Sequence, residues 1–386
     1  MSSLKLSRFT NNIPTIFQWV VFLSINCLFI AKYITRTHVN LLVGLSLYLV
    51  VIFVLYLFVK RIMNCHDRTI KYLYFSLSLL ILTGIVIIQY STNPYSLMVD
   101  RWSAINNFIE YLFQGKYPYL AKTHLGGYGS PFPVWQFLHI PFYLLGNIAL
   151  GMCFSFILLS ITLRWYFSDY RKPLIFMLFL FVSPAFWYEV TTRSDLFYNL
   201  LDCLLIILVF HKNKYSISNH PIIIGIICGL FLSTRLSVFF PFLIYFFKDF
   251  MDVNGKQKLI FFSVSVLSFV ISFAPLFIWD FHSLMFFRYN PFVLQTRQGS
   301  ILEVILLLVV AILFSLKWKT DFNKCIHLIS YSLLLLVLMT FIHNMILDNF
   351  HYGLFTGKYD ITYFNMALPF CVFILCSHNF IDMTKA

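Results

Sequence analysis

The sequence predicts an all-α integral membrane protein with about twelve transmembrane helices and one long loop at the membrane surface. Three observations support this fold class. Of the 386 residues, 60% are hydrophobic and 20% aromatic, whereas only 11% are charged, a composition far outside that of soluble proteins. Apolar runs recur along the whole chain. Most of the 28 Lys and Arg residues lie in short clusters between these runs.

Each expected span is an apolar run bounded by charged or turn-forming residues. The spans are 14–34, 39–59, 71–90, 149–166, 173–185, 195–210, the pair 221–234 and 236–247, and then 259–279, 300–316, 325–346 and 361–379. Residues 1–70 contain the first two spans and are expected to form an appended N-terminal transmembrane hairpin. Residues 71–386 are expected to form the functional core.

The basic residues predict the orientation of these spans, because cytoplasmic loops carry an excess of Lys and Arg. Most basic residues fall on one side if both termini are cytoplasmic, and residues 98–146 then face the other side. The net charge of +13 is explained by this bias, so nucleic-acid binding is not expected. The absence of an Asn-x-Ser/Thr sequon favours a bacterial envelope, and therefore the inner membrane.

Residues 98–146 form the longest stretch that cannot simply cross a bilayer. Asp100 opens it, and the apolar residues that follow recur at a helical spacing, which predicts a helix lying on the membrane surface. Gly115 ends this helix, and Pro131 and Pro133 begin another apolar run. A helix, a polar turn and a re-entering helix in this order would wall a cavity at the interface.

Ionisable residues lie at the head of the span 195–210 and inside it. Arg193 and Asp195 come at its start, and Asp195 suits a helix N-terminus, so helix capping is the alternative role for Asp195. Asp202 lies two turns further on the same face. An ionisable residue inside a span is expected to be functional or paired.

A further cation, Arg235, falls between the paired spans and in the outer part of the membrane. A buried Arg needs an anion, so either a bound phosphate or a core acid such as Asp202 is expected beside it. The outside segments 280–299 and 347–360 add basic residues, and for each of these the alternative is an anchor at lipid headgroups. They are Arg288, Arg297, His351 and Lys358.

Together these segments resemble the C-type glycosyltransferases, which are polytopic membrane enzymes that use polyprenyl-phosphate sugars. The resemblance covers roughly residues 71–380. The motifs that carry it are Asp100-Arg101-Trp102, Gly115-Lys116-Tyr117-Pro118-Tyr119, Pro131-Phe132-Pro133, Asp195 in a Thr-Arg-Ser-Asp-Leu segment, and a half-helix from Gly229 to Pro241. It implies an extracytoplasmic juxtamembrane-helix loop at 98–146.

The resemblance also implies a reaction. A sugar would pass, with inversion, from a polyprenyl-phosphate-linked donor to a lipid-linked or envelope glycan acceptor on the extracytoplasmic face. Asp100 would take the proton of the acceptor hydroxyl, and helix capping is its alternative role. The donor phosphate and the substrates would be held by Arg101, Lys116, Tyr117, Tyr119, His124, Arg193, Asp195, Arg235, Arg288, Arg297, His351 and Lys358.

No cofactor is assigned. A divalent metal stays open, because several members of the family carry a second acid two residues after the first, whereas Trp102 stands there in this chain. The other expected partners are membrane lipids.

Two other functions fit parts of the pattern. A transporter or flippase of lipid-linked sugars would share basic cavities and broken helices, but its inverted repeats are not seen in this sequence. A lipid-linked glycan polymerase or ligase would use Arg and His in one long outside loop, which the segment 280–299 matches faintly. The sugar, the acceptor and the pathway do not follow from the sequence.

Overall fold

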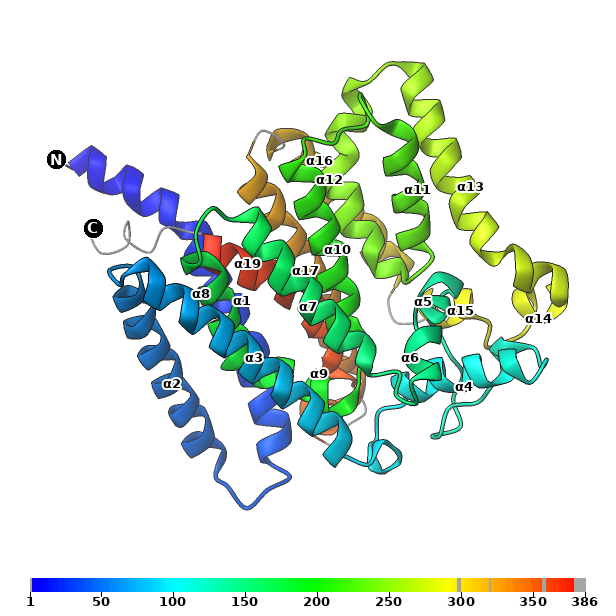
Figure 1. The fold of residues 1–386 in the computed structure, drawn as a ribbon, viewed down its shortest axis with the longest axis horizontal. Coiled ribbons are helices and arrows are strands. Elements are labelled where there is room, and N and C mark those ends of the chain that lie inside the picture. The colour runs from blue at the N-terminus through cyan, green and yellow to red at the C-terminus, as the bar shows by residue number, and fades with distance from the viewer. Residues whose placement is uncertain (1, 297–299, 319–320, 356–358, 378–386) are drawn as a thin grey trace.

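The computed structural model describes residues 2–296, 300–318, 321–355 and 359–377, and it consists of helices joined by short connections (Figure 1). In chain order, with 3-10 helices marked η, they are α1 (Ser2–Ile34), α2 (Leu41–Ile62), α3 (Asp67–Ser91), η1 (Pro94–Ser96), α4 (Arg101–Phe113), η2 (Pro118–Leu120), α5 (Pro133–Leu138), α6 (Ile140–Leu144), α7 (Leu150–Tyr166), α8 (Arg171–Phe181), α9 (Pro184–Thr192), α10 (Leu196–Lys212), α11 (Pro221–Leu232), η3 (Leu236–Val238), α12 (Phe239–Asp252), α13 (Gly255–Trp279), α14 (Phe281–Met285), α15 (Pro291–Thr296), α16 (Ile301–Trp318), α17 (Phe322–Asp348), α18 (Phe350–Leu354), η4 (Ile361–Met366) and α19 (Leu368–Ser377). No strand occurs among these residues, so the predicted all-α class is confirmed.

Five helices in the described part of the chain are long and apolar enough to cross a membrane. They are α1 from Ile16 onward, α2, α3, α13, and α17 as far as Leu347. α8 and α9 form a further candidate with a 68° bend between them. α7, α11 and the η4–α19 segment are also apolar, but they are shorter than the roughly 20 residues that usually span the hydrocarbon layer. The chain is therefore a membrane protein with a helix at each predicted span, but the predicted number of spans is not confirmed.

The centre of the bundle is α19. Every residue from 368 to 376 is buried, and α1, α8, α10 and α17 pack around this helix. A helix that is apolar all round is expected to be enclosed in this way. The apolar side chains of α2 and α13 are mostly exposed instead, as suits helices that face lipid.

The first two helices have different surroundings. α1 is joined to the centre by polar contacts, because Ser183 donates to Asn26 Oδ1 at 2.7 Å and Lys32 Nζ donates to the carbonyl of Tyr359 at 2.6 Å. α2 packs at the edge, against α1 and α8. Only α2 therefore has the peripheral position expected of an appended hairpin, and a domain boundary at residue 70 stays a prediction.

Residues 98–146 fold in the predicted order of helix, polar turn and second helix. α4 buries one face through Trp102, Ile105, Phe108 and Ile109, as the apolar spacing predicts. η2, α5 and α6 complete the segment, and α14 contacts η2 beside it. In Figure 1, α4, α5, α6, α14 and α15 gather at one end of the bundle.

α11 and α13 make the most extensive contact of any helix pair among the described residues. Two glycines of α11 permit the approach. A Cβ atom on Gly229 would lie 2.3 Å from the carbonyl oxygen of Ser265, and one on Gly225 would lie 3.0 Å from that of Phe261. α11 ends after Leu232, as predicted for the first of the paired spans, and α12 begins at Phe239. The close contact between α11 and α13 therefore fixes the end of α11, where the break before α12 begins.

We expect Gly229→Ala to destabilise the protein, because the added methyl group would push against the backbone of α13. Overpacking of this kind costs on the order of 1–3 kcal/mol. The apparent Tm of detergent-purified protein measures the effect. Gly255→Ala is the control, since a Cβ at Gly255 has no neighbour within 4 Å among the described residues. Equal Tm values for the two variants would contradict the proposed role of the contact.

Candidate functional site

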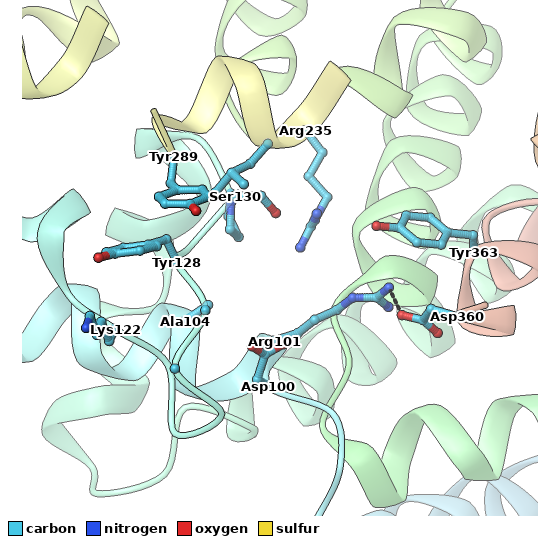
Figure 2. A pocket seen from close by; sticks show the side chains of 14 residues that line it. Asp100, Arg101, Ala104, Lys122, Tyr128, Ser130, Arg235, Tyr289, Asp360 and Tyr363 are labelled. Carbon is cyan, nitrogen blue, oxygen red and sulfur yellow. Dashed lines mark hydrogen bonds and ion pairs between the residues drawn. The ribbon is translucent and has the colours of Figure 1, made fainter. Parts of the chain in front are cut away.

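A polar cavity of about 610 Å³ opens between the 98–146 segment, the break after α11, the segment before and within α15, and η4 (Figure 2). Five charged side chains line it: Asp100, Arg101, Lys122, Arg235 and Asp360. They come from three segments that lie far apart in the sequence, namely 98–146, the break after α11 and the start of η4. The fold therefore gathers charges of both signs around one space inside an otherwise apolar chain.

Asp100 precedes the first turn of α4, but its side chain makes no capping hydrogen bond to the described helix. Its Oδ2 instead accepts a hydrogen bond from Thr123 Oγ1 at 2.6 Å. A Cβ at Gly127 would lie 3.1 Å from the same oxygen, so glycine leaves the space beside the carboxylate open. The capping alternative for Asp100 is thus wrong, and the carboxylate faces the cavity.

The turn that holds Thr123 is closed by its own backbone. Thr123 N donates to Gly127 O at 2.8 Å, and an antiparallel bridge pairs Lys122 with Tyr128. Gly126 takes a φ of 83°, which glycine adopts without steric cost. This tight turn places Lys122, Gly127 and Tyr128 on the cavity wall.

Three residues that were expected to bind substrate, His124, Tyr119 and Tyr117, contact the protein scaffold and do not line the described cavity. His124 Nδ1 lies 2.8 Å from Ser103 Oγ and its Nε2 lies 2.9 Å from the carbonyl oxygen of Leu97, so His124 fixes the turn against α4. The Tyr119 hydroxyl donates to the carbonyl of Pro131, and Tyr117 is buried. These three residues lie outside the described cavity lining, because their side chains satisfy polar groups of the scaffold.

Arg101 connects α4 to η4. Its Nη2 donates to Asp360 Oδ2 at 2.6 Å, and its Nη1 donates to Thr362 Oγ1 at 2.6 Å and to Ser194 Oγ at 2.8 Å. The guanidinium also lies over the ring of Tyr363, 4.8 Å from its centroid. Arg101 therefore lines the cavity as predicted, although both of its terminal nitrogens are already engaged.

Burial alone would raise the pKa of the Asp360 carboxyl. The Arg101 guanidinium and the hydrogen bonds from Thr362 outweigh burial, so the pKa lies below its ordinary value. Because this pKa is lower in the folded state than in the unfolded state, ionised Asp360 stabilises the fold at any pH above the ordinary pKa of Asp. That contribution to stability is lost only as the pH falls through the lower folded pKa. Asp360 is therefore ionised across the neutral range.

Among the residues that the structure describes, Arg235 and Asp195 form the most deeply buried ion pair. Arg235 Nε donates to Asp195 Oδ2 at 2.9 Å, and Nη2 approaches both carboxylate oxygens at 2.6 Å. The side chain of Asp195 is fully buried and that of Arg235 is 6% exposed. Asp195 makes no capping bond to the described part of α10, so its capping alternative is wrong. Asp202 is not the partner of Arg235 either, since its Oδ2 accepts from Ser155.

The extended backbone around Arg235 is held by the re-entering part of the loop. Phe132 N donates to Thr234 O at 3.0 Å, and Val134 N donates to Ser233 O at 3.1 Å. Gln295 adds a bridge, because its Nε2 donates to the carbonyl of Ser130. The Nη1 atom of Arg235 makes no hydrogen bond to a described residue, and Figure 2 shows the guanidinium pointing into the cavity.

An apolar groove of about 340 Å³ adjoins the polar cavity. Its walls come mainly from η3, α12, α16 and α17, with side chains such as Leu236, Phe240, Val304 and Val337. The groove and the cavity share Ser130, Arg235, Leu294 and Tyr363. Arg235 therefore stands at the junction of a polar and an apolar space.

Other predicted site residues are placed elsewhere. Arg193 donates to the carbonyls of Gln89 and Thr92, and so satisfies the C-terminal end of α3. Lys116 Nζ donates to Gln114, and exposed His351 packs on Phe355. These three residues lie outside the described cavity lining, because each already pairs with a nearby polar or aromatic group.

Three predicted site residues remain, namely Arg288, Arg297 and Lys358. Arg297 and Lys358 are not among the described residues. Exposed Arg288 lies over the ring of Tyr289, 5.4 Å from its centroid, and it is this ring that lines the cavity. Of the basic residues that were predicted to hold the substrates, Arg101 and Arg235 therefore line the cavity.

Several lining residues had no predicted role. They are Lys122, Tyr128, Tyr289, Asp360 and Tyr363. Lys122, Tyr128, Tyr289 and Asp360 lie in segments that were expected outside the membrane, whereas Tyr363 lies near the start of the predicted span 361–379. The Gly-Gly-Tyr-Gly run at 126–129 was the available signal for Tyr128, since glycines let a backbone approach a ligand closely. Asp360 and Tyr363 carried no signal, because their partner Arg101 lies more than 250 residues earlier in the chain.

No group of three or more His, Cys, Asp or Glu side chains is arranged to hold a metal ion in the residues that the structure describes. No family model matches the chain, and no curated protein or solved structure is similar to it.

We expect Asp195→Asn to destabilise the protein by about 3–5 kcal/mol, because it leaves the Arg235 charge buried without a partner. In the double variant Asp195→Asn/Arg235→Met both charges are gone, so its loss of stability should be smaller than the sum of the losses in Asp195→Asn and Arg235→Met. Thermal unfolding of the purified protein measures the cycle. Asp67→Asn is the control, since Asp67 pairs with Arg171 but is 80% exposed. Additive losses would show that the pair is not coupled.

Proposed function

We propose that this protein is an integral membrane glycosyltransferase that transfers a sugar from a polyprenyl-phosphate-linked donor to a glycan or glycolipid acceptor. The observation that carries the proposal is the junction at Arg235, where the polar cavity meets the apolar groove. A polyprenyl-phosphate sugar has the same two parts, a hydrocarbon chain and a charged, hydroxyl-rich head. Its phosphate lies where these parts join.

The donor would lie with its isoprenoid chain in the apolar groove and its sugar in the polar cavity. The phosphate then comes beside Arg235, whose Nε edge is bound to Asp195 and whose Nη1 is available to an anion. Asp195 serves this arrangement as a positioning residue, because it holds the guanidinium plane from the buried side. Arg101, which Asp360 holds in the same way, adds positive charge to the cavity.

Asp100 would act as the base. Its carboxylate takes the proton of an acceptor hydroxyl while the hydroxyl oxygen forms a bond to the anomeric carbon of the donor sugar. The bond from that carbon to the phosphate oxygen breaks, and its electron pair leaves with the lipid phosphate beside Arg235. The proton ends on Asp100, and attack from the face opposite the phosphate inverts the configuration.

We place the site on the extracytoplasmic side of a bacterial inner membrane, with both termini in the cytoplasm, because this orientation follows the distribution of Lys and Arg. Nucleotide sugars are made in the cytoplasm and are too polar to cross hydrocarbon. A lipid carrier avoids this barrier, since its chain stays in the bilayer and its phosphate lies at the interface.

We expect Asp100→Asn to lower the rate of sugar transfer by about 100-fold or more, because the amide cannot accept the proton. The assay is transfer by purified protein from lipid-linked donors to membrane glycolipids. Glu110→Gln is the matched control, since Glu110 lies on the same helix, pairs with Gln114 and stands outside the described lining. A transporter of the same lipid would give no transfer product in this assay, even as the unmodified protein, and full turnover by Asp100→Asn would remove Asp100 from the reaction.

We also expect the purified protein to use polyprenyl-phosphate sugars and not nucleotide sugars. Radiolabelled nucleotide sugars supplied to carrier-free protein should give no product, whereas the corresponding lipid-linked sugars should. Strong transfer from nucleotide sugars would overturn both the donor class and the proposed sidedness.

A further inference from the structure

Two tyrosines from distant segments stack on one another at one end of the polar cavity. The ring centroids of Tyr128 and Tyr289 are 5.1 Å apart, with an angle of 12° between the planes. Phe287 meets Tyr128 edge to face at 5.0 Å. Both tyrosines line the cavity, and in Figure 2 they lie together on the side away from Asp360 and Tyr363.

This end of the cavity is separate from the apolar groove. The residues shared with the groove are Ser130, Arg235, Leu294 and Tyr363, whereas neither tyrosine lines the groove. In Figure 2 the tyrosines lie on one side of Ser130 and Arg235 and Tyr363 lie on the other, with Ala104 and Asp100 below. A lipid head that enters from the groove therefore comes to lie beside Arg235 and leaves the tyrosine end free for a second ligand.

The chemistry of the free end suits a saccharide. A pyranose ring has a face of C–H groups that packs on an aromatic ring and a rim of hydroxyls that needs hydrogen-bond partners. Because the two rings stack on one another, the first kind of contact is made by the part of each ring that lines the cavity, and the tyrosine hydroxyls provide the second. Lys122, paired with Tyr128 across the turn, adds a cationic donor to the same wall. Tyr289 is 36% exposed, so a soluble ligand can reach the wall.

We infer that the Tyr128–Tyr289 wall is a saccharide-binding subsite, and that it receives the terminal sugar of the acceptor. The term acceptor rests on the proposed function, whereas the binding of a saccharide does not. The subsite places a sugar hydroxyl next to Asp100, on the opposite side from the lipid head. It takes the role that the sequence had suggested for Tyr117, Tyr119 and His124.

Saturation-transfer difference NMR on the full-length protein in detergent tests the subsite without any transfer reaction. The probes are the methyl glycosides of glucose, galactose, mannose, N-acetylglucosamine and rhamnose. We expect at least one to bind, with the strongest transfer to the C–H protons of one ring face. Tyr128→Ala and Tyr289→Ala should each weaken binding by about tenfold or more.

Tyr143→Ala is the matched control, because Tyr143 stacks on Phe113 in the same segment but outside the described cavity lining. It should bind the glycosides as the unmodified protein does. If the alanine variants fail to elute as monodisperse protein, Tyr289→Phe keeps the stacked ring and should weaken binding by about threefold through the lost hydroxyl. Unchanged binding in that variant would then count against the subsite.

Binding of no glycoside in the panel would overturn the inference, as would full binding by the alanine variants. The inference and the proposed function can fail separately. Tyrosine-dependent binding without transfer from any lipid-linked donor would leave the saccharide subsite standing and refute the enzyme. Transfer whose acceptor KM is unchanged in Tyr289→Ala would keep the enzyme and remove the subsite.

Discussion

The buried ion pair between Asp195 and Arg235 is the interaction on which the site depends. An ionised side chain in an apolar interior is stable only beside an opposite charge and with its hydrogen bonds satisfied. The fully buried carboxylate of Asp195 meets this condition through the fork of Arg235. The start of α10 and the break after α11 must therefore meet at one point, and Arg235 is held where the polar cavity and the apolar groove join.

The broken helix creates a second requirement. Where α11 ends and η3 begins, the backbone polar groups lose their helical partners, and in an apolar setting each of them must find another. The amides of Phe132 and Val134 meet the carbonyls of Thr234 and Ser233, so the re-entering part of the loop satisfies the break. The loop and the break are thus parts of one structure, which explains why the cavity forms between them.

The three acids of the site have different neighbours, and this difference gives them different chemistry. Asp195 and Asp360 are each bound to an arginine. Asp100 accepts a hydrogen bond from the neutral hydroxyl of Thr123, and no described cation pairs with it. A carboxylate that is not already bound to a cation is free to meet an acceptor hydroxyl, whereas the other two acids are occupied in holding their arginines. The surroundings therefore favour Asp100 over the other two acids as the base in the proposed reaction.

Much of the fold could be predicted from the sequence, because helix formation and membrane insertion depend on local composition and periodicity. Each predicted span holds a helix, and the amphipathic face of α4 follows from the spacing of Trp102, Ile105 and Phe108. The need of Arg235 for a nearby anion was also predictable, since a lone cation in an apolar run must be paired. Its partner was not predictable. Asp195 and Asp202 lie on the same helix, and only the packing of α10 against the break selects Asp195. For the same reason the parts that Asp360 and Tyr289 play in the site were not predictable: each depends on a contact with a residue far away in the chain, and such contacts leave no periodic pattern in the sequence.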